Sequence, residues 1–316
     1  DALPSRWLAG RGTPEQEAAV QRAKGAVVPR LLEASDALTG PVKLHFDSRG
    51  AISNLKLVPQ EASVVPPVHG EAELQVHAVG LNFRDVLNVL GLYPGDPGAP
   101  GSDCSAIVVG VGGDGLLGER SIGRPCLGWA PAALASVART DLRLLATLEC
   151  VQMDQACTLP STWSTAHMTM LGAKPRSGEG LLVQAGAGGV GLASIEYARW
   201  LRASVRATVG RPHKHHHLRV IGLAAGATLS SRDPGSFALG AAIVLEGRRF
   251  HCVLNSLSFD FLSGAAALLG EGAHFVEIGK IRVWSPELQA AAAPAARFRV
   301  LALDSAIESE RWWTHR

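Results

Sequence analysis

The sequence contains few cysteines, and their spacing matches no known site. Its five cysteines are scattered and include no C-x-x-C pair, which argues against a disulfide framework and against a structural zinc site. The longest apolar runs fall well short of the ~20 residues that a membrane span needs. No basic-then-apolar signal peptide opens the chain, and Asp1-Ala2-Leu3-Pro4 is typical of a piece of a longer protein. We therefore expect a cytoplasmic protein with no membrane partner.

The chain also lacks an excess of charge of either sign. Its 30 Lys and Arg residues and 28 Asp and Glu residues leave a formal charge of +2, so no strong field favours nucleic acid as a partner. Hydrophobic residues make up 47% of the chain and charged residues 18%, which is the composition of an ordinary globular enzyme. A length of 316 residues is enough for two domains.

The rhythm of apolar residues divides the chain into two halves. Residues 1–40 are expected to be a linker, and residues 41–160 carry short alternating runs that predict a mostly β domain. Residues 161–305 alternate between strand-like and helix-like runs, which predicts an α/β domain with a doubly wound parallel sheet. Residues 306–316 are expected to be a tail. The strands predicted for the α/β half are Leu181–Gln184, Ser204–Thr208, Ala227–Leu229, His251–Leu254, His274–Glu277 and Phe298–Leu303.

A glycine-rich motif follows the first of these predicted strands. Its residues are Gly186, Ala187, Gly188, Gly189, Val190 and Gly191, which fit G-x-G-x-x-G. Alone the pattern is weak, because a glycine-rich turn can merely pack a helix on a strand. Here a helix-like run follows the motif and a second strand follows that run, and this order favours a dinucleotide site in which free N–H groups of the helix bind a pyrophosphate.

The residues after the second predicted strand favour NADPH over NADH. An NAD site usually has Asp or Glu about 20 residues after the glycines, but this chain has no acid between Glu196 and Asp233. Instead Arg211 and Lys214 can neutralise a 2′-phosphate, and Thr208 can donate a hydrogen bond to it. A solvated basic loop is the alternative interpretation of these cations.

A series of segments in the β half and the α/β half resembles one enzyme family. The residues 80–95, GLNFRDVLNVLGLYPG, resemble the enoyl reductase domain of modular polyketide synthases and related fatty acid synthases, in the zinc-independent branch of the medium-chain dehydrogenase/reductase superfamily. The glycine motif and three further segments recur in the same order; the three are Ser230–Asp233, Val253–Leu257 and Phe275–Lys280. The resemblance covers about residues 41–303, and residues 1–40 then correspond to the linker from a preceding synthase domain.

The resemblance implies a fold, a reaction and partners. The fold is a GroES-like, mostly β substrate domain joined to a Rossmann domain. The reaction is NADPH-dependent reduction of a trans-2-enoyl thioester carried on an acyl carrier protein, beside neighbouring synthase domains. Hydride is delivered to Cβ, and the resulting enolate is stabilised and protonated at Cα.

The resemblance also implies roles for individual residues. Tyr93 matches a proton donor to Cα, although a tyrosine that closes the turn before Pro94 is an equal alternative. Lys280 matches an alternative donor and enolate stabiliser, and its alternative is a surface lysine at the end of a strand. The residues matched to cofactor binding are Asn82, Asp85, Asn255, Ser256, Leu257, Ile278 and Gly279.

Three departures from the family pattern raise alternatives. Ala302 stands where the family often has an aspartate in its sixth strand, and Asp304 lies two residues on, about 6–7 Å along a strand. Ser102 replaces the histidine of zinc-dependent relatives, so no catalytic metal is expected, and Asp103 replaces a glutamate. The segment that returns to the β domain is expected to be missing after the tail. The alternatives are a degenerate domain that only binds dinucleotide or packs on neighbours, and a free-standing quinone oxidoreductase.

Overall fold

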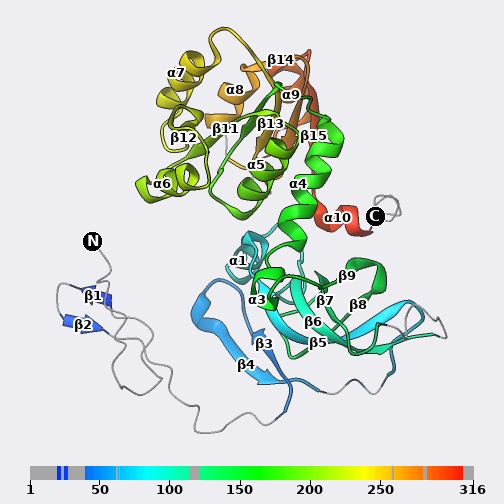
Figure 1. Ribbon diagram of the computed structural model, residues 1–316. Helices are drawn as coiled ribbons and strands as arrows, with labels where there is room; N and C mark the ends of the chain where they lie inside the picture. Colours follow the sequence, from blue (N-terminus) through cyan, green and yellow to red (C-terminus); the bar gives the residue numbers. More distant parts are fainter. Residues whose placement is uncertain are drawn as a thin grey trace.

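The computed structural model describes residues 20–22, 25–27, 40–61, 63, 65–113, 121–257, 260–279 and 283–308. Two lobes are joined by helix α4 (Pro160–Ala173) (Figure 1). Most of the predicted linker, Lys280 and most of the tail lie outside the described residues. Within the linker, β1 (Val20–Arg22) pairs antiparallel with β2 (Gly25–Val27). Among the helices of the described residues, none is both long and apolar enough to cross a membrane.

The lower lobe is mostly β, as the alternating pattern predicted, and the strands of its main sheet are antiparallel. Its main sheet has the order β8-β5-β6-β7-β9, and alternate residues of the central strands point inward, so that Ala72, Leu74, Ala106 and Val108 are buried. A separate hairpin, β3–β4, and two short helices flank the sheet. The elements are β3 (Val42–Phe46), β4 (Leu55–Pro59), β5 (Glu71–Gly80), α1 (Phe83–Val89), β6 (Asp103–Val111), β7 (Pro125–Trp129), β8 (Val137–Asp141), β9 (Leu145–Thr147) and α3 (Met153–Ala156).

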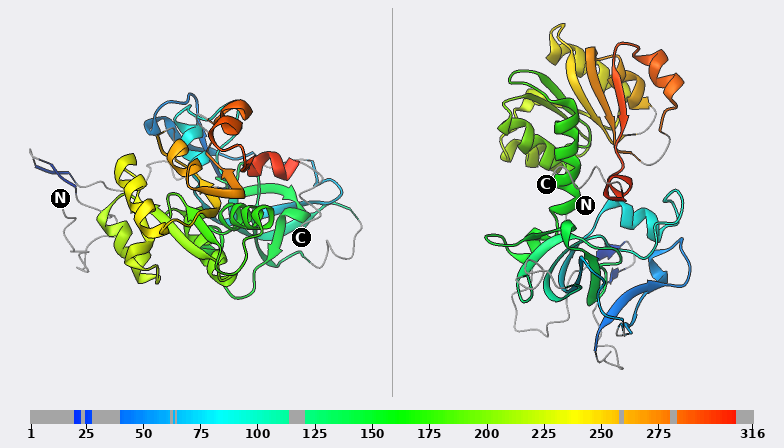
Figure 2. Two further views of the ribbon diagram at one scale, coloured as in Figure 1. Left: turned by 90° about the horizontal axis from the view of Figure 1, so that it is seen from above. Right: turned by 90° about the vertical axis from the view of Figure 1, so that its right-hand side faces the viewer.

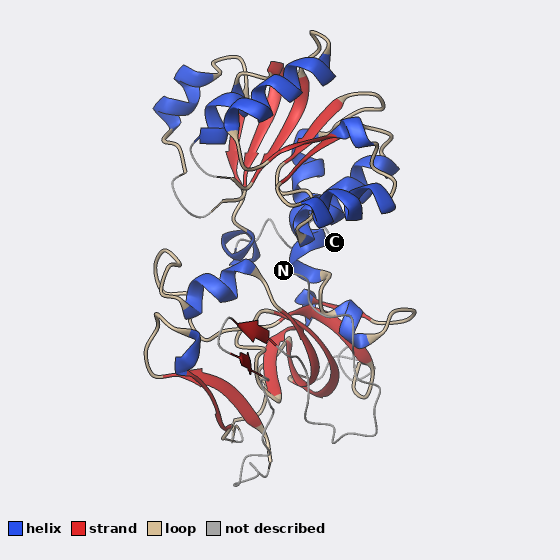
Figure 3. Cartoon of the chain, turned by 90° about the vertical axis from the view of Figure 1, so that its left-hand side faces the viewer, coloured by secondary structure: helices blue, strands red, loops and turns tan. Residues whose placement is uncertain are grey.

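The upper lobe contains the predicted doubly wound parallel sheet. Its strands have the order β12-β11-β10-β13-β14-β15, and every neighbouring pair is parallel. Helices cover both faces (Figure 3). The elements are β10 (Gly180–Val183), α5 (Gly189–Trp200), β11 (Ser204–Val209), α6 (Pro212–Val220), β12 (Thr228–Ser230), α7 (Pro234–Leu245), β13 (Phe250–Asn255), α8 (Asp260–Ala266), β14 (Leu269–Glu277), α9 (Pro286–Ala292), β15 (Arg297–Val300) and α10 (Leu303–Glu308).

The core of the upper lobe explains why the sequence of its central strand, β10, is one apolar run. Leu181, Leu182 and Val183 of β10 are all fully buried, because the two faces of a parallel sheet are both covered. Leu181 and Val183 belong to the core under α5, whereas Leu182 belongs to the core under α7 and α8. The strand order reverses between β10 and β13, which is the switch point where doubly wound sheets bind ligands.

The end of the last strand shows which way the sheet faces. β15 ends at Val300 rather than at the predicted Leu303, and α10 begins at Leu303. This helix lies between the lobes (Figure 2), and its Asp304 accepts a hydrogen bond from Tyr93 of the lower lobe. The carboxyl end of β15 therefore points toward the lower lobe. Because all six strands are parallel, the carboxyl ends of the other five point the same way. Any ligand at the switch point therefore lies between the two lobes.

Candidate functional site

The glycine motif forms a tight loop between β10 and α5. A Cβ on Gly186 would lie 2.6 Å from the Cβ of Ala207, and a Cβ on Gly191 would lie 2.6 Å from the Ala185 carbonyl oxygen. Both positions therefore admit only glycine. Ala185, just before the motif, has a left-handed backbone with φ of 51°. This conformation costs a non-glycine residue free energy and often marks a functional site.

The remaining motif residues form the exposed part of the loop. Gly188 is the N-cap of α5 and is exposed, as is Gly189, whereas Ala187 and Val190 are half-buried. A glycine N-cap has no side chain to occupy the first N–H groups of the helix, which leaves them for an anionic ligand. The loop thus has the geometry of a pyrophosphate cradle.

Thr208 has a different place from the one predicted. Its side chain is fully buried, and its hydroxyl accepts a hydrogen bond from the Ala185 N–H at 3.0 Å, while its carbonyl accepts one from the Gly186 N–H at 2.9 Å. A fully buried hydroxyl cannot contact a 2′-phosphate. Thr208 instead holds the entrance of the glycine loop on β11, and the prediction of a direct phosphate contact is corrected accordingly.

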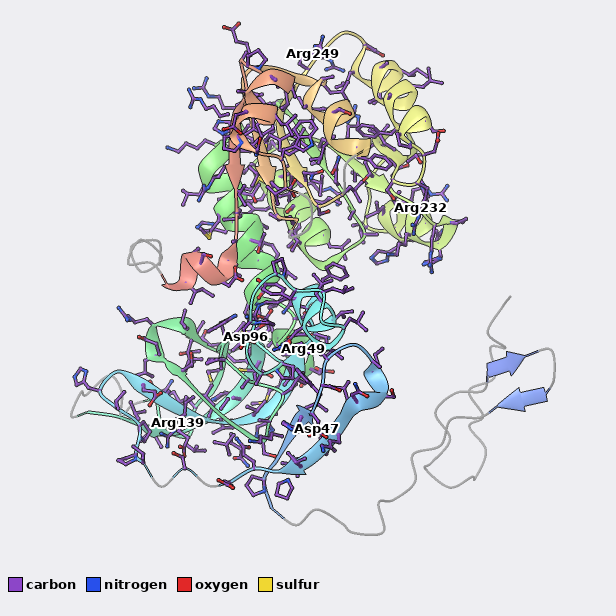
Figure 4. All side chains as sticks on the ribbon, turned by 180° about the vertical axis from the view of Figure 1, so that it is seen from behind. Asp47, Arg49, Asp96, Arg139, Arg232 and Arg249 are labelled. Carbon is purple, nitrogen blue, oxygen red and sulfur yellow. The ribbon has the colours of Figure 1, made fainter. Side chains whose placement is uncertain are left out.

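Three cations gather at the carboxyl end of β11. Arg211 and Lys214 are exposed at the start of α6, as the sequence order predicted. Arg232 lies beside them, in the turn after β12 (Figure 4). Its Nε is 2.6 Å from the position that a Cβ on Gly210, the neighbour of Arg211, would take. The sequence prediction missed Arg232. The signal was available, since the segment 230–233 follows the strand that pairs with β11.

Buried polar side chains form a row at the switch point. Gln184 directly follows β10, and Asn255 and Glu277 end the neighbouring strands β13 and β14; all three are at least nine-tenths buried. The amide nitrogen and oxygen of Gln184 and the Oδ1 of Asn255 have no hydrogen-bond partner among the described residues. Buried polar atoms without partners are costly. Together with the glycine loop, they fit a dinucleotide that supplies the missing partners.

The other residues predicted to bind the cofactor lie beside this row. The Ser256 hydroxyl donates to the Gln184 carbonyl at 3.4 Å, and the Leu257 carbonyl accepts from the Asn255 amide at 3.0 Å. The Ile278 N–H donates to the Asn255 carbonyl at 2.9 Å, and the Gly279 N–H donates to Glu277 at 2.6 Å. The structure thus brings the two predicted segments, 255–257 and 278–279, together at one edge of the sheet.

Asp85 and Asn82 define the start of α1. Asp85 is buried, and its two carboxylate oxygens accept the N–H groups of Asn82 and Gly101, each at 2.9 Å. Asp85 thus holds two segments of the lower lobe together, and Asn82 is the half-buried N-cap residue of α1. A cofactor contact by Asn82 or Asp85 stays a prediction.

Tyr93, Arg84 and Asp304 form an interlobe triad. The Tyr93 hydroxyl donates a hydrogen bond to Asp304 Oδ2. The guanidinium of Arg84 lies 5.3 Å from the centre of the Tyr93 ring, and its Nε is 4.0 Å from Asp304 Oδ2. The predicted donor Tyr93 and the predicted acid Asp304 are therefore in contact, although 211 positions separate them.

The structure corrects the predicted place of Asp304 and adds Arg84 to the site. Asp304 is in the first turn of α10, not on the sixth strand, because β15 ends at Val300 and the chain then turns toward the lower lobe. Arg84 was not predicted as a site residue. The helical spacing of α1 alone does not reveal that its side chain reaches a tyrosine after the end of that helix.

Asp103, at a position where the resemblance implies a glutamate, links the lower lobe to α4. Its carboxylate accepts the Ser161 N–H at 2.8 Å and the Ser161 hydroxyl at 2.5 Å. Burial raises the pKa of Asp103, and these two hydrogen bonds oppose that rise. Among the described residues no group of three or more His, Cys, Asp or Glu side chains is placed to hold a metal.

A groove of about 720 Å³ lies elsewhere, between β7, β9 and the helices α4 and α5. Its walls include Trp163, Tyr197 and Trp200. None of the predicted site residues lines it. The candidate site is therefore at the carboxyl edge of the upper sheet and the interlobe triad, not in this groove.

Comparison with known proteins agrees with this geometry. No protein-family model matches the chain. Erythronolide synthase EryA2 of Saccharopolyspora erythraea is 38% identical over 272 residues, which cover 84% of this chain but only 8% of that synthase. The CurK enoyl reductase structure is 30% identical, with a TM-score of 0.78, over 86% of this chain and 84% of that one. The JamJ enoyl reductase structure is 26% identical, with a TM-score of 0.80 and coverage of 88% and 85%.

Proposed function

This chain belongs to the enoyl reductase domains of modular polyketide synthases, in the medium-chain dehydrogenase/reductase superfamily, and we propose that it reduces a trans-2-enoyl thioester with NADPH. The substrate is carried on the phosphopantetheine of an acyl carrier protein, and neighbouring synthase domains are its partners. The observation that carries the proposal is the union of a dinucleotide cradle with a tyrosine–carboxylate pair across the two lobes.

Several groups of the chain are suited to hold NADPH. The glycine loop and the N-terminus of α5 receive the pyrophosphate. Arg211, Lys214 and Arg232 are the cations for the 2′-phosphate, since an ion of that charge needs several donors. The side-chain amide of Gln184 and the Oδ1 of Asn255, which have no hydrogen-bond partner within the described residues, would bind near the nicotinamide end. When bound, NADPH supplies the hydride that reduces Cβ.

The interlobe triad supplies the proton for Cα. Tyr93 gives up its hydroxyl proton as the new C–H bond forms, and an enolate is a strong enough base to take it. Before that step the hydroxyl donates its single proton to Asp304, and the O–H must rotate away from Asp304 and toward Cα when the proton is transferred. The cation of Arg84 lies 5.3 Å from the ring centre and stabilises the phenolate that remains.

One assay separates this proposal from the two alternatives. Purified chain is mixed with NADPH and either crotonyl-N-acetylcysteamine or a benzoquinone, and NADPH oxidation is followed by its absorbance. We expect saturable turnover with the thioester. Turnover with the quinone alone favours a quinone oxidoreductase, and saturable NADPH binding without any turnover favours a degenerate domain.

A further inference from the structure

Glu277 is a buried acid that ends β14 at the switch point. Its side chain is 5% exposed, and it faces Asn255 in the register of the parallel strands. One carboxylate oxygen accepts the Asn255 side-chain amide at 2.5 Å, and the other accepts the Gly279 N–H at 2.6 Å. Among the described residues, no ion pair to Glu277 is present. Its contacts therefore go to the two segments expected to meet the cofactor.

These hydrogen bonds set the shape of the turn after β14. A Cβ on Gly279 would lie 2.7 Å from the Glu277 Oε1, so the turn closes directly onto the carboxylate. The Ile278 N–H donates to the Asn255 carbonyl, and the Leu301 N–H donates to the Glu277 carbonyl. Glu277 thus joins the ends of β13, β14 and β15 at one point.

The chemistry of the side chain limits what can replace it. A carboxylate can accept hydrogen bonds on both oxygens, whereas the amide of glutamine has one acceptor and one donor end. In a Glu277→Gln variant, the NH2 group must face either the Asn255 amide or the Gly279 N–H, and one of the two hydrogen bonds is lost. The shape of the side chain is otherwise unchanged.

From this arrangement we infer that Glu277 is a positioning residue, which holds Asn255 and the turn Ile278–Gly279 in the geometry that receives the nicotinamide end of NADPH. The inference rests on the proposed function. It assigns Glu277 no contact with the reacting atoms and no proton transfer. Its effect should be confined to one end of the cofactor, because the cations proposed to bind the adenosine end lie after β11 and at the start of α6.

Two ligands test this division of the cofactor site. The affinities of the wild-type chain, Glu277→Gln and Glu271→Gln for NADPH and for 2′,5′-ADP are measured by calorimetry at pH 8. Glu271 is an exposed residue on the same strand, so its variant is the matched control. We expect Glu277→Gln to bind NADPH about tenfold more weakly and 2′,5′-ADP within twofold of wild type, because one charge-assisted hydrogen bond is lost at the nicotinamide end only.

The outcomes are distinguishable. If Glu277→Gln weakens both ligands equally, or neither, the positioning role is wrong while the proposed function stands. If the wild-type chain binds neither ligand, the proposed function is wrong and this inference with it. Should Glu277→Gln fail to fold, as judged by circular dichroism, Glu277→Asp is measured instead; its shorter carboxylate cannot span both partners, and the same selective loss is expected.

Discussion

The glycine loop and the interlobe triad are built in opposite ways. The loop consists of six consecutive residues, and its geometry is set by backbone packing that leaves no room for a Cβ at Gly186 or Gly191. The triad consists of three side chains from α1, the loop after it and α10. One region is local and set by main-chain sterics, whereas the other exists only when the two lobes are assembled.

This contrast suggests that the two regions have separate functions. The loop and the cations beside it bind the cofactor, and the triad acts on the substrate after hydride transfer. Changes in the triad should therefore affect turnover without affecting cofactor affinity. Changes in the loop should affect cofactor affinity first.

The largest effect is expected from Tyr93→Phe. Without the hydroxyl, the proton for Cα must come from a poorer donor, and kcat should fall about 100-fold. The affinity for NADPH should stay within twofold of wild type. Steady-state kinetics and calorimetry measure the two quantities.

Tyr197→Phe is the matched control, because Tyr197 is the other of the two tyrosines in the sequence. Tyr197 lies on α5 and hydrogen-bonds to His167 on α4, away from the triad. Its kcat should be unchanged. A Tyr93→Phe variant with wild-type kcat would show that Tyr93 only closes a turn. Adding Asp304→Ala to Tyr93→Phe should lower kcat little further, because Tyr93 and Asp304 act as one unit.

The second largest effect is expected from Gly191→Ala. The new Cβ would meet only backbone atoms, at 2.6 to 2.8 Å, so the loop must distort. Overpacking of this kind costs roughly 1–3 kcal/mol, and we expect NADPH affinity to fall about 30-fold, which corresponds to the middle of that range. Gly226→Ala, where a Cβ meets nothing within 4 Å, is the control. Equal affinities for the two variants would refute the steric account of the cradle.

A smaller effect is expected from removing cations. The double variant Arg211→Ala with Lys214→Ala should reduce the preference for NADPH over NADH about tenfold, because exposed charges contribute modestly and Arg232 remains. The ratio of the two affinities is the measurement. Arg176→Ala, exposed in the turn before β10, should leave the ratio unchanged. An unchanged ratio in the double variant would identify these cations as a solvated surface.

The smallest effect concerns pH. Burial raises the pKa of Glu277 from 4.5 to about 7. Between these values the folded chain keeps a proton that the unfolded chain has released, so this group lowers the free energy of unfolding as pH rises from 4.5 to 7. Glu277→Gln removes the effect. Its melting temperature relative to wild type should therefore rise between pH 5 and pH 8. A difference independent of pH would contradict the assignment.

Much of the fold was predictable because its signals are local. The apolar run of β10, the glycine motif and the alternation of strands and helices each occupy a few consecutive residues, and the predicted doubly wound sheet and mostly β lobe are confirmed. The order of segments also brought 255–257 and 278–279 to one sheet edge. These features follow from sequence periodicity and the rules of parallel sheets.

The rest depends on tertiary contacts that periodicity does not encode. Thr208 ends up beneath the loop rather than at the phosphate, because its strand pairs tightly with the loop entrance. Arg84 and Arg232 acquire their places through packing between separate elements. Asp304 was expected along the sixth strand but lies in α10, because the edge strand β15 ends at Val300, where its pairing with β14 ends.

The most direct test of the account follows the two hydrogens that are added to the substrate. A trans-2-enoyl thioester is reduced with unlabelled NADPH in D2O, and the saturated product is examined by NMR and mass spectrometry. The account predicts one deuterium at Cα, delivered through an exchangeable group of the protein, and none at Cβ. Deuterium at Cβ, or no saturated product from a chain that binds NADPH, would contradict it.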